Sequence, residues 1–420
     1  MRMPQIIRAE TDADFIAMVP ALLGMRPTRS LVLVMFEGSR SAGGARVDLP
    51  AGRSTRELRS LADLCVNIAS RSRGIDRVAT VVYSDTTFEH ERGIPWVDLS
   101  RAIEQRMQRA GFGITAQLCV APDGWGNARA TGADRGPRPL AEIELSPSVE
   151  RVSGIPVDDP QTWGTLPEPE PWLDEQIDEY LELNSAHWSD PTSRDDGWPD
   201  VISPGDAESL HNLIELIVSR PAKAMGALEI ATLAAYASLP SWRDTLMLQM
   251  AFGRRIGQRA ADSHRFWNAE RQRRGGTMDE VVAASRLTGD ACTDLEESVL
   301  AGLITGESAV RPSLDRCTNA IAALLRAAAN VDLDLRAGLL CMAAWLNWAI
   351  GRSSAAHALI AQGVLVDPSH RMMQIVEVLV DSGRVPEWMF SRHEDERESS
   401  AGVDGWVDDE FNPASPHQLW

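Results

Sequence analysis

Lysine is almost absent from this 420-residue sequence: Lys223 is the only one, against 40 arginines. Schiff-base formation and nucleotide-binding phosphate loops both require a lysine, so either would have to use Lys223. The segment around it, residues 220–226, does not match a phosphate loop. We therefore expect neither chemistry from this chain.

Cysteine and histidine are few and scattered. The cysteines are Cys65, Cys119, Cys292, Cys317 and Cys341. Because they stand far apart with no C-x-x-C pair, we expect neither a disulfide framework nor a zinc site, and most should be small core residues in a reducing cytoplasm. His90 lies between two glutamates but lacks a second ligand at helical spacing. No metal site is predicted, and no cofactor is indicated.

Long apolar runs are missing as well. The longest candidate, residues 338–350, is interrupted by Asn347, and residues 1–4 lack the apolar core of a signal peptide. We expect no membrane span and no export signal. The sequence also has no G-x-G-x-x-G after a strand, no H-E-x-x-H and no G-x-S-x-G. No catalytic class is therefore indicated.

Acidic charge is concentrated in two segments. Of the net charge of −19, residues 146–206 contribute 15 acidic residues against two arginines, and residues 391–420 contribute eight against two. The remainder is close to neutral, so the overall charge says little about a binding surface. We predict four parts: a domain at 1–145, an acidic connector at 146–206, a helical domain at 207–390 and a disordered tail at 391–420.

The first domain begins with a helix, a strand and a hairpin. The helix is predicted from four apolar residues that share one face: Phe15, Met18, Val19 and Leu22. Thr11 or Asp12 caps its start, and Gly24 ends it. Residues 31–36 are uniformly apolar, which predicts a strand covered on both faces. A glycine-rich turn at 37–44 and a half-exposed strand at 46–49 follow.

These residues carry a family resemblance. The pattern Val-Pro-x-Leu-Leu-Gly-x-Arg-Pro-x-x-Ser-Leu-Val at 19–32, followed by Arg-Val-Asp-Leu-Pro at 46–50, resembles the start of the actinobacterial family of unknown function DUF4192. The resemblance covers roughly the first 120 residues, and a looser helical similarity returns near the C-terminus. It implies no activity, because the function of the family is unassigned.

The rest of the first domain alternates helix and strand. Helices are predicted after residue 54 and at 96–110, and strands at 77–83 and 114–120. This order implies right-handed crossovers, so we expect a mixed, mostly parallel α/β sheet with helices on both faces. Residues 121–140 are predicted to form a long irregular loop.

From residue 207 to about 390 the pattern is helical. Within the last three helices, the turn and second helix of a tetratricopeptide repeat are resembled by Gly351, Ala356, Ile360, Gly363 and Pro368, so a repeat-like (TPR-like) bundle is predicted at 335–382. The connector contains four tryptophans: Trp163, Trp172, Trp188 and Trp198. We expect it to lie on the surface of one or both domains, with a short helix at 173–183.

Ligands of open α/β sheets bind beyond the carboxyl ends of parallel strands. Those ends contain Asp85 and Asp123, and the loop that follows contains Arg129 and Arg135. Together they would suit a phosphorylated or polar small molecule. The alternative is that both aspartates only make hydrogen bonds within turns.

A second group stands where the first helix meets the first strand. Arg26 and Arg29 precede the strand, and Arg46 and Asp48 lie on the predicted partner strand. An Arg–Asp pair that holds this turn is one interpretation, and anion recognition is the other.

Residues 253–276 form a basic segment. Its nucleic-acid candidates are Arg254, Arg255, Arg259, Trp267, Arg271, Arg273 and Arg274. Arginines interleaved with aromatic residues can bind and stack nucleic-acid bases. A solvated helix that pairs with the acidic connector or tail would explain the pattern as well.

Together these patterns favour a cytoplasmic binding or regulatory protein without assignable catalytic activity, whose helical domain contacts a protein partner. One alternative is an enzyme that acts on a phosphorylated small molecule or nucleotide at the strand ends. The other is nucleic-acid binding through the basic segment.

Overall fold

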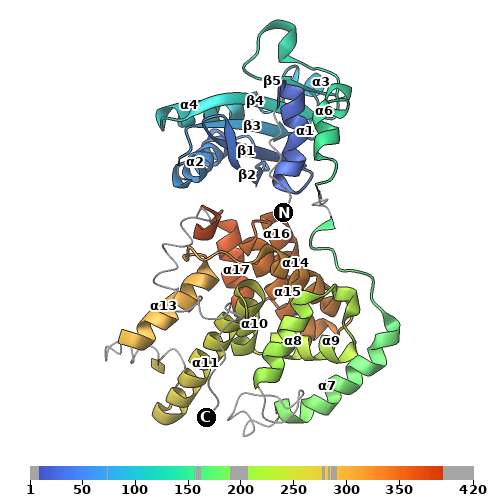
Figure 1. Cartoon of the computed structure of the whole chain (residues 1–420), viewed down its shortest axis with the longest axis vertical. Helices are drawn as coiled ribbons and strands as arrows, with labels where there is room; N and C mark the ends of the chain where they lie inside the picture. Colours follow the sequence, from blue (N-terminus) through green and yellow to red (C-terminus); the bar gives the residue numbers. More distant parts are fainter. Residues whose placement is uncertain are drawn as a thin grey trace, which may run out of the picture. The chain divides into compact units, whose positions relative to one another are not determined.

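The computed structural model describes residues 9–72, 74–155, 157, 162–189, 207–276, 280–281, 284 and 291–390 (Figure 1). The chain divides into two compact units, Met1–Trp163 and Gly164–Trp420. No helix in the described ranges is long and apolar enough to cross a membrane. The predicted tail at 391–420 and connector residues 190–206 lie outside the described residues.

The N-terminal unit is built on a five-stranded sheet with the strand order β2-β1-β3-β4-β5. The strands are β1 (Ser30–Glu37), β2 (Arg40–Asp48), β3 (Arg77–Tyr83), β4 (Gly113–Ala121) and β5 (Gly124–Asn127). The sheet is mixed, as predicted, but only β3 and β4 pair in parallel. The expectation of a mostly parallel sheet was therefore wrong.

The position of β1 explains this error. Because β1 pairs antiparallel with both β2 and β3, those two strands run in one direction with β1 between them. Helix α2 (Thr55–Arg71) joins β2 to β3 across β1, whereas α4 (Val97–Arg109) joins β3 to its direct neighbour β4. The helical crossovers predicted the strand directions correctly but not which strands are adjacent.

Two strand boundaries also differ from the prediction. β2 begins at Arg40, so the hairpin turn contains only Gly38 and Ser39 rather than extending to Gly44. Residues 124–127 form β5 where an irregular loop was expected. Glycines in both segments concealed the strands, because glycine is depleted in strands.

Helix α1 (Asp12–Leu23) covers one face of the sheet (Figure 1). Thr11 caps it, and Gly24 ends it in the left-handed conformation with φ 68°, both as predicted. Its buried face matches the predicted one only in part: Val19 is buried and Phe15 packs, partly buried, against the core of the sheet, but Leu22 is 41% exposed. The buried apolar residues are Ala13, Ile16, Ala17 and Val19. The prediction had selected the largest apolar side chains, and it shares only Val19 with this set.

Helices α2 and α4 pack against each other and cover the opposite face. The buried residues of α2 include Leu58, Leu61, Cys65 and Ile68, as predicted. Gln117 of β4 points away from the α1 side, where its neighbour Leu118 lies. Its amide donates to the carbonyl of Ser100 in α4 at 2.7 Å. The predicted coverage of both faces is thus confirmed.

Short elements complete this unit: α3 (Phe88–Glu91), η1 (Gly132–Arg135), α5 (Ala141–Glu144) and α6 (Pro147–Val152). The start of α6 is tied to the start of α1. The Ser146 hydroxyl donates to Asp14 at 2.5 Å, and this bond holds the pKa of the Asp14 carboxyl below its usual range. Residues up to 152 therefore belong to the packed N-terminal unit.

The C-terminal unit is helical throughout its described secondary structure. Its longer helices are α7 (Asp174–Ser189), α8 (Ala207–Ser219), α9 (Ala227–Ser238), α10 (Pro240–Phe252), α11 (Arg254–Arg274), α13 (Ala291–Thr305), α14 (Leu314–Ala329), α15 (Leu333–Ala349), α16 (Ser353–Val366) and α17 (Arg371–Asp381). The helix predicted near Met278 falls largely outside the described residues. The other predicted helices are present.

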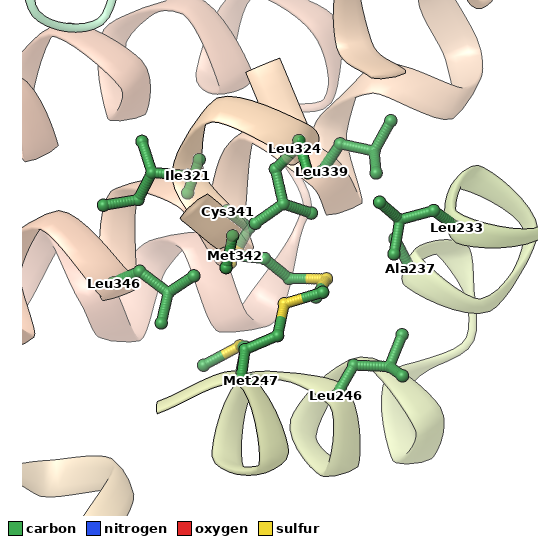
Figure 2. Packing of buried hydrophobic residues seen from close by; sticks show 14 of the residues in the cluster. Leu233, Ala237, Leu246, Met247, Ile321, Leu324, Leu339, Cys341, Met342 and Leu346 are labelled. Atoms are coloured by element: carbon green, nitrogen blue, oxygen red, sulfur yellow. The ribbon is translucent and has the colours of Figure 1, made fainter. Parts of the chain in front are cut away.

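Helix α15 forms the centre of this unit. Every residue from 337 to 349 is buried, which is typical of a helix covered on all sides. Figure 2 shows Met342 and Leu346 of α15 packed among Ile321 of α14 and Met247 of α10. The core is thus assembled around one central helix.

The described part of the connector packs on the helical unit through aliphatic side chains. Leu173 and Ile177 are buried in the helical core, whereas Trp172 is 70% exposed. The side chains of Trp188 and Trp198 lie outside the described residues. Aliphatic residues at the start of α7 therefore attach this segment.

Candidate functional site

A cavity of about 550 Å³ lies in the N-terminal unit. It is lined by Arg53, Glu91, Arg92, Gly93, Ile94, Trp96, Val97, Asp98, Arg135 and Gly136. Seven of these ten residues lie at 91–98, in the connection that leads from the carboxyl end of β3 into the first turn of α4. This is the edge of the sheet at which the sequence predicted a site.

The connection has an unusual backbone. Arg92 and Trp96 adopt left-handed conformations, with φ 51° and 58°. Such conformations cost roughly 1–2 kcal/mol for residues other than glycine, so the surrounding packing must hold them. Ile94 and Trp96 supply that packing, because they are only 5% and 6% exposed. The strained turn starts α4 at the wall of the cavity.

Arg53 is fixed from two sides. Its Nη1 lies 2.8 Å from Oε2 of Glu91. Its guanidinium carbon lies 4.2 Å from the centre of the Trp96 ring, within the range of a cation–π contact. The ion pair and the ring contact together hold the guanidinium group against one wall of the cavity.

Arg135 reaches the cavity because the loop after β5 folds back onto that strand. Trp125 and Arg138 exchange two backbone hydrogen bonds, of 2.9 and 2.7 Å. A Cβ atom at position 126 would lie 2.2 Å from the Arg135 carbonyl oxygen, so only glycine permits this approach. Gly126 thus determines where Arg135 stands.

The charge in the cavity favours anions. Glu91 already neutralises Arg53. Neither Arg92 nor Arg135 forms an ion pair within the part of the chain that the structure describes. Trp96, the N-cap residue of α4, makes no side-chain cap hydrogen bond, so the backbone N–H groups of Val97 and Asp98 add positive potential, whereas the Asp98 carboxylate accepts from the N–H of Leu99. With Arg53, Arg92 and Arg135 against Glu91 and Asp98, the lining keeps an excess of one positive charge. Guanidinium groups beside an open helix N-terminus suit a phosphate or a carboxylate.

The predicted aspartates do not line this cavity. Asp123 accepts hydrogen bonds from the backbone N–H groups of Phe88 and Glu89 at 2.9 and 3.1 Å, so it caps α3. Asp85 lies 3.8 Å from Arg29. Arg129 bonds Glu104 at 2.9 Å. Of the four residues predicted at the strand ends, only Arg135 lines the cavity.

The second predicted group holds the junction between α1 and β1. Nη2 of Arg46 donates to Asp48 at 2.6 Å and to the carbonyl of Thr28 at 3.1 Å. The Arg29 carbonyl accepts from the N–H of Leu49 at 3.2 Å. Arg26 is exposed. This geometry matches the Arg–Asp pair of the first interpretation, and none of these residues lines the cavity.

The basic segment forms α11, where several arginines have partners. Arg254 bonds Asn212 at 2.6 Å. Arg273, followed by Arg274, holds the pKa of Glu270 at about 2. Arg265 pairs with Asp262. The side chains of Arg255 and Arg259 are half-buried, and that of Arg271 is exposed. Trp267 is only 5% exposed, so a base cannot stack on its ring in this structure.

Metal and thiol chemistry find little support in the described part of the chain. No group of three or more histidine, cysteine or acidic side chains there could hold a metal ion. Burial raises the pKa of four thiols to about 12, those of Cys65, Cys119, Cys317 and Cys341. Burial thus disfavours the thiolate form, which is the nucleophile, at these four positions.

Sequence reasoning missed Arg53, Arg92, Trp96 and Asp98. One signal was available. The segment Arg92-Gly93-Ile94-Pro95-Trp96 follows a buried strand and directly precedes a helix, which is where sheets of this type place ligands. Arg53 comes from a different connection, so only the folded chain brings it there.

Comparisons with known proteins give a family and nothing finer. The family model named Domain of unknown function (DUF4192) matches residues 13–387, far beyond the first 120 residues that carried the resemblance. The comparisons with curated proteins and with solved structures found no match. The matched region spans both units, so the chain belongs to the DUF4192 family over nearly its whole length.

Proposed function

We propose that this protein is a binding protein whose N-terminal unit takes an anionic small molecule, in particular a phosphorylated one. The observation that supports this most is the convergence of Arg92, Arg135 and the uncapped start of α4 on one cavity. Its volume of about 550 Å³ falls in the usual range of small-molecule sites, roughly 300–1,000 Å³.

A binding role is favoured over a catalytic one. The enzyme alternative relied on Asp85 and Asp123 as carboxylates that face a substrate. Asp123 instead accepts backbone hydrogen bonds with both oxygens, and Asp85 faces Arg29. Neither aspartate lines the cavity, so neither is placed to transfer protons to a ligand bound there.

The helical unit adds the second half of the proposal. Helices α15, α16 and α17 follow one another and pack together, which suits a repeat-like module that contacts a protein partner. The repeat-like arrangement, the partner and a cytoplasmic location all belong to this proposal. Nucleic-acid binding is not part of it, because Trp267 is buried.

Removing the two arginines without ion pairs tests the ligand site. Charge-assisted hydrogen bonds contribute roughly 1.5–3 kcal/mol, so Arg92→Ala and Arg135→Ala should each weaken binding by about tenfold or more. The measurement is a thermal-shift screen of pyrophosphate, adenosine monophosphate (AMP) and citrate, followed by calorimetry of the compounds that bind.

Arg59→Ala is the matched control, because it removes an exposed arginine of the same unit that does not line the cavity. Its binding should equal that of the wild type. Binding that is equally strong in Arg92→Ala, Arg135→Ala and wild type would contradict the proposal, and so would the absence of any bound anion.

A further inference from the structure

We infer that the ligand is a nucleotide, with its base stacked on Arg53 and its phosphate held by Arg92 and Arg135. This inference rests on the proposed function and narrows its ligand class. It is carried by the stack of Arg53 on Trp96 in the cavity wall, which an anion alone would not need.

The guanidinium group of Arg53 is a fixed, planar surface. One of its faces covers the ring of Trp96, which is 6% exposed, whereas 31% of the Arg53 side chain is exposed. Arg53 therefore covers a buried ring, and part of its own side chain stays accessible to a ligand in the cavity. Its ion pair with Glu91 holds the plane in this orientation.

Such a surface suits an aromatic ring. Nucleobases stack on guanidinium planes as well as on aromatic side chains, because every base offers a π-face. A base on Arg53 would extend the existing pair into a stack of three planar groups. Since Glu91 already balances the Arg53 charge, a neutral ring fits this position better than a second anion.

The rest of the cavity suits the rest of a nucleotide. Arg92 and Arg135 offer guanidinium groups for a phosphate, beside the first turn of α4. One carboxylate oxygen of Asp98 accepts from the backbone N–H of Leu99 at 3.0 Å. Its second oxygen is suited to accept from sugar hydroxyl groups. The cavity therefore carries groups for all three parts of a nucleotide.

A comparison of two ligands on the full chain tests this inference. Ribose 5-phosphate has the sugar and phosphate of AMP but no base. In isothermal titration calorimetry, wild-type protein should bind AMP at least about tenfold more tightly than ribose 5-phosphate, because only AMP has a base that can stack on Arg53.

Arg53→Lys isolates the stacking surface. Lysine keeps the positive charge beside Glu91 but lacks the planar face. We expect AMP to bind this variant about tenfold more weakly than wild type, with ribose 5-phosphate unchanged. Arg59→Lys, outside the cavity, should change neither affinity. Far-UV circular dichroism checks that both variants fold.

The outcomes separate the two proposals. Equal affinity of wild type for AMP and ribose 5-phosphate would overturn the nucleotide inference and leave an anion site in place. An equal loss of affinity for AMP and for ribose 5-phosphate in Arg53→Lys would also overturn the nucleotide inference. Failure of every anion to bind would overturn the proposed function itself. If Arg53→Lys does not fold, the wild-type comparison alone decides.

Discussion

Replacing Gly338 with alanine is expected to destabilise the helical unit by about 3 kcal/mol or more, because helices α9 and α15 touch at this position. A Cβ atom there would lie 2.2 Å from the carbonyl oxygen of Ala237 and 2.7 Å from its carbonyl carbon. Backbone atoms of a packed helix cannot rotate away as the end of a side chain can. One of the two helices would have to move.

Helix propensity opposes this effect but is smaller. Alanine is more favourable than glycine inside a helix by about 1 kcal/mol, so the substitution would stabilise an isolated helix. Gly302 of α13 is the matched control, because the nearest atom to its added Cβ lies 4.0 Å away. Gly302→Ala should be neutral or slightly stabilising. Urea unfolding followed by circular dichroism at 222 nm measures both, and equal midpoints for the two variants would refute the packing argument.

Removing Arg326 should cost the helical unit about 3 kcal/mol, because this arginine is a nearly buried charge with four hydrogen bonds. Its side chain is 10% exposed. It bonds both oxygens of Glu170 at 2.6 and 3.0 Å, and the carbonyls of Ala222 and Met225 at 2.7 Å each. Arg326→Met would leave all four acceptors without this donor. The same group attaches the connector to α14.

The contribution of Arg326 to the free energy of unfolding should depend on pH. Its hydrogen bond to Glu170 is the largest cause that lowers the pKa of that carboxyl below 4.5. A lowered folded-state pKa gives stability that is present above the unfolded pKa and is lost as pH falls through the folded pKa. The difference in unfolding free energy between wild type and Arg326→Met should therefore be largest near neutral pH and shrink in acid.

Arg371→Met serves as control for this series, because Arg371 is exposed. Surface substitutions usually change stability by less than about 0.5 kcal/mol, and we expect that here at every pH. If the difference in unfolding free energy between wild type and Arg326→Met stays constant from neutral to acidic pH, the ion pair with Glu170 is not the source of that difference.

The elements were predictable because they depend on local patterns. Ser54 starts α2 and Gly24 ends α1, as capping residues and glycine normally do. The uniformly apolar run at 31–36 was recognised as a buried strand, and residues 77–83 were recognised as the next strand. Adjacency of strands was not predictable in the same way. Insertion of β1 between β2 and β3 depends on long-range pairing, which no local pattern encodes.

The site shows the same limit. Its edge of the sheet was predicted from strand ends alone, but the side chains there have roles set by three-dimensional contacts. Asp123 caps a short helix that the sequence did not indicate. Arg53 enters the cavity wall through contacts with Glu91 and Trp96, which lie about 40 residues away in the chain. Such groupings follow from the fold rather than from spacing.

Hydrogen–deuterium exchange on the full chain, with and without saturating AMP, tests the location of the ligand site most directly. The ligand should slow exchange of backbone amides at 91–99 and 132–137, which contain every lining residue except Arg53, and leave the helical unit unchanged. Slower exchange confined to the helical unit, or none at all with AMP bound, would contradict the assignment of this cavity.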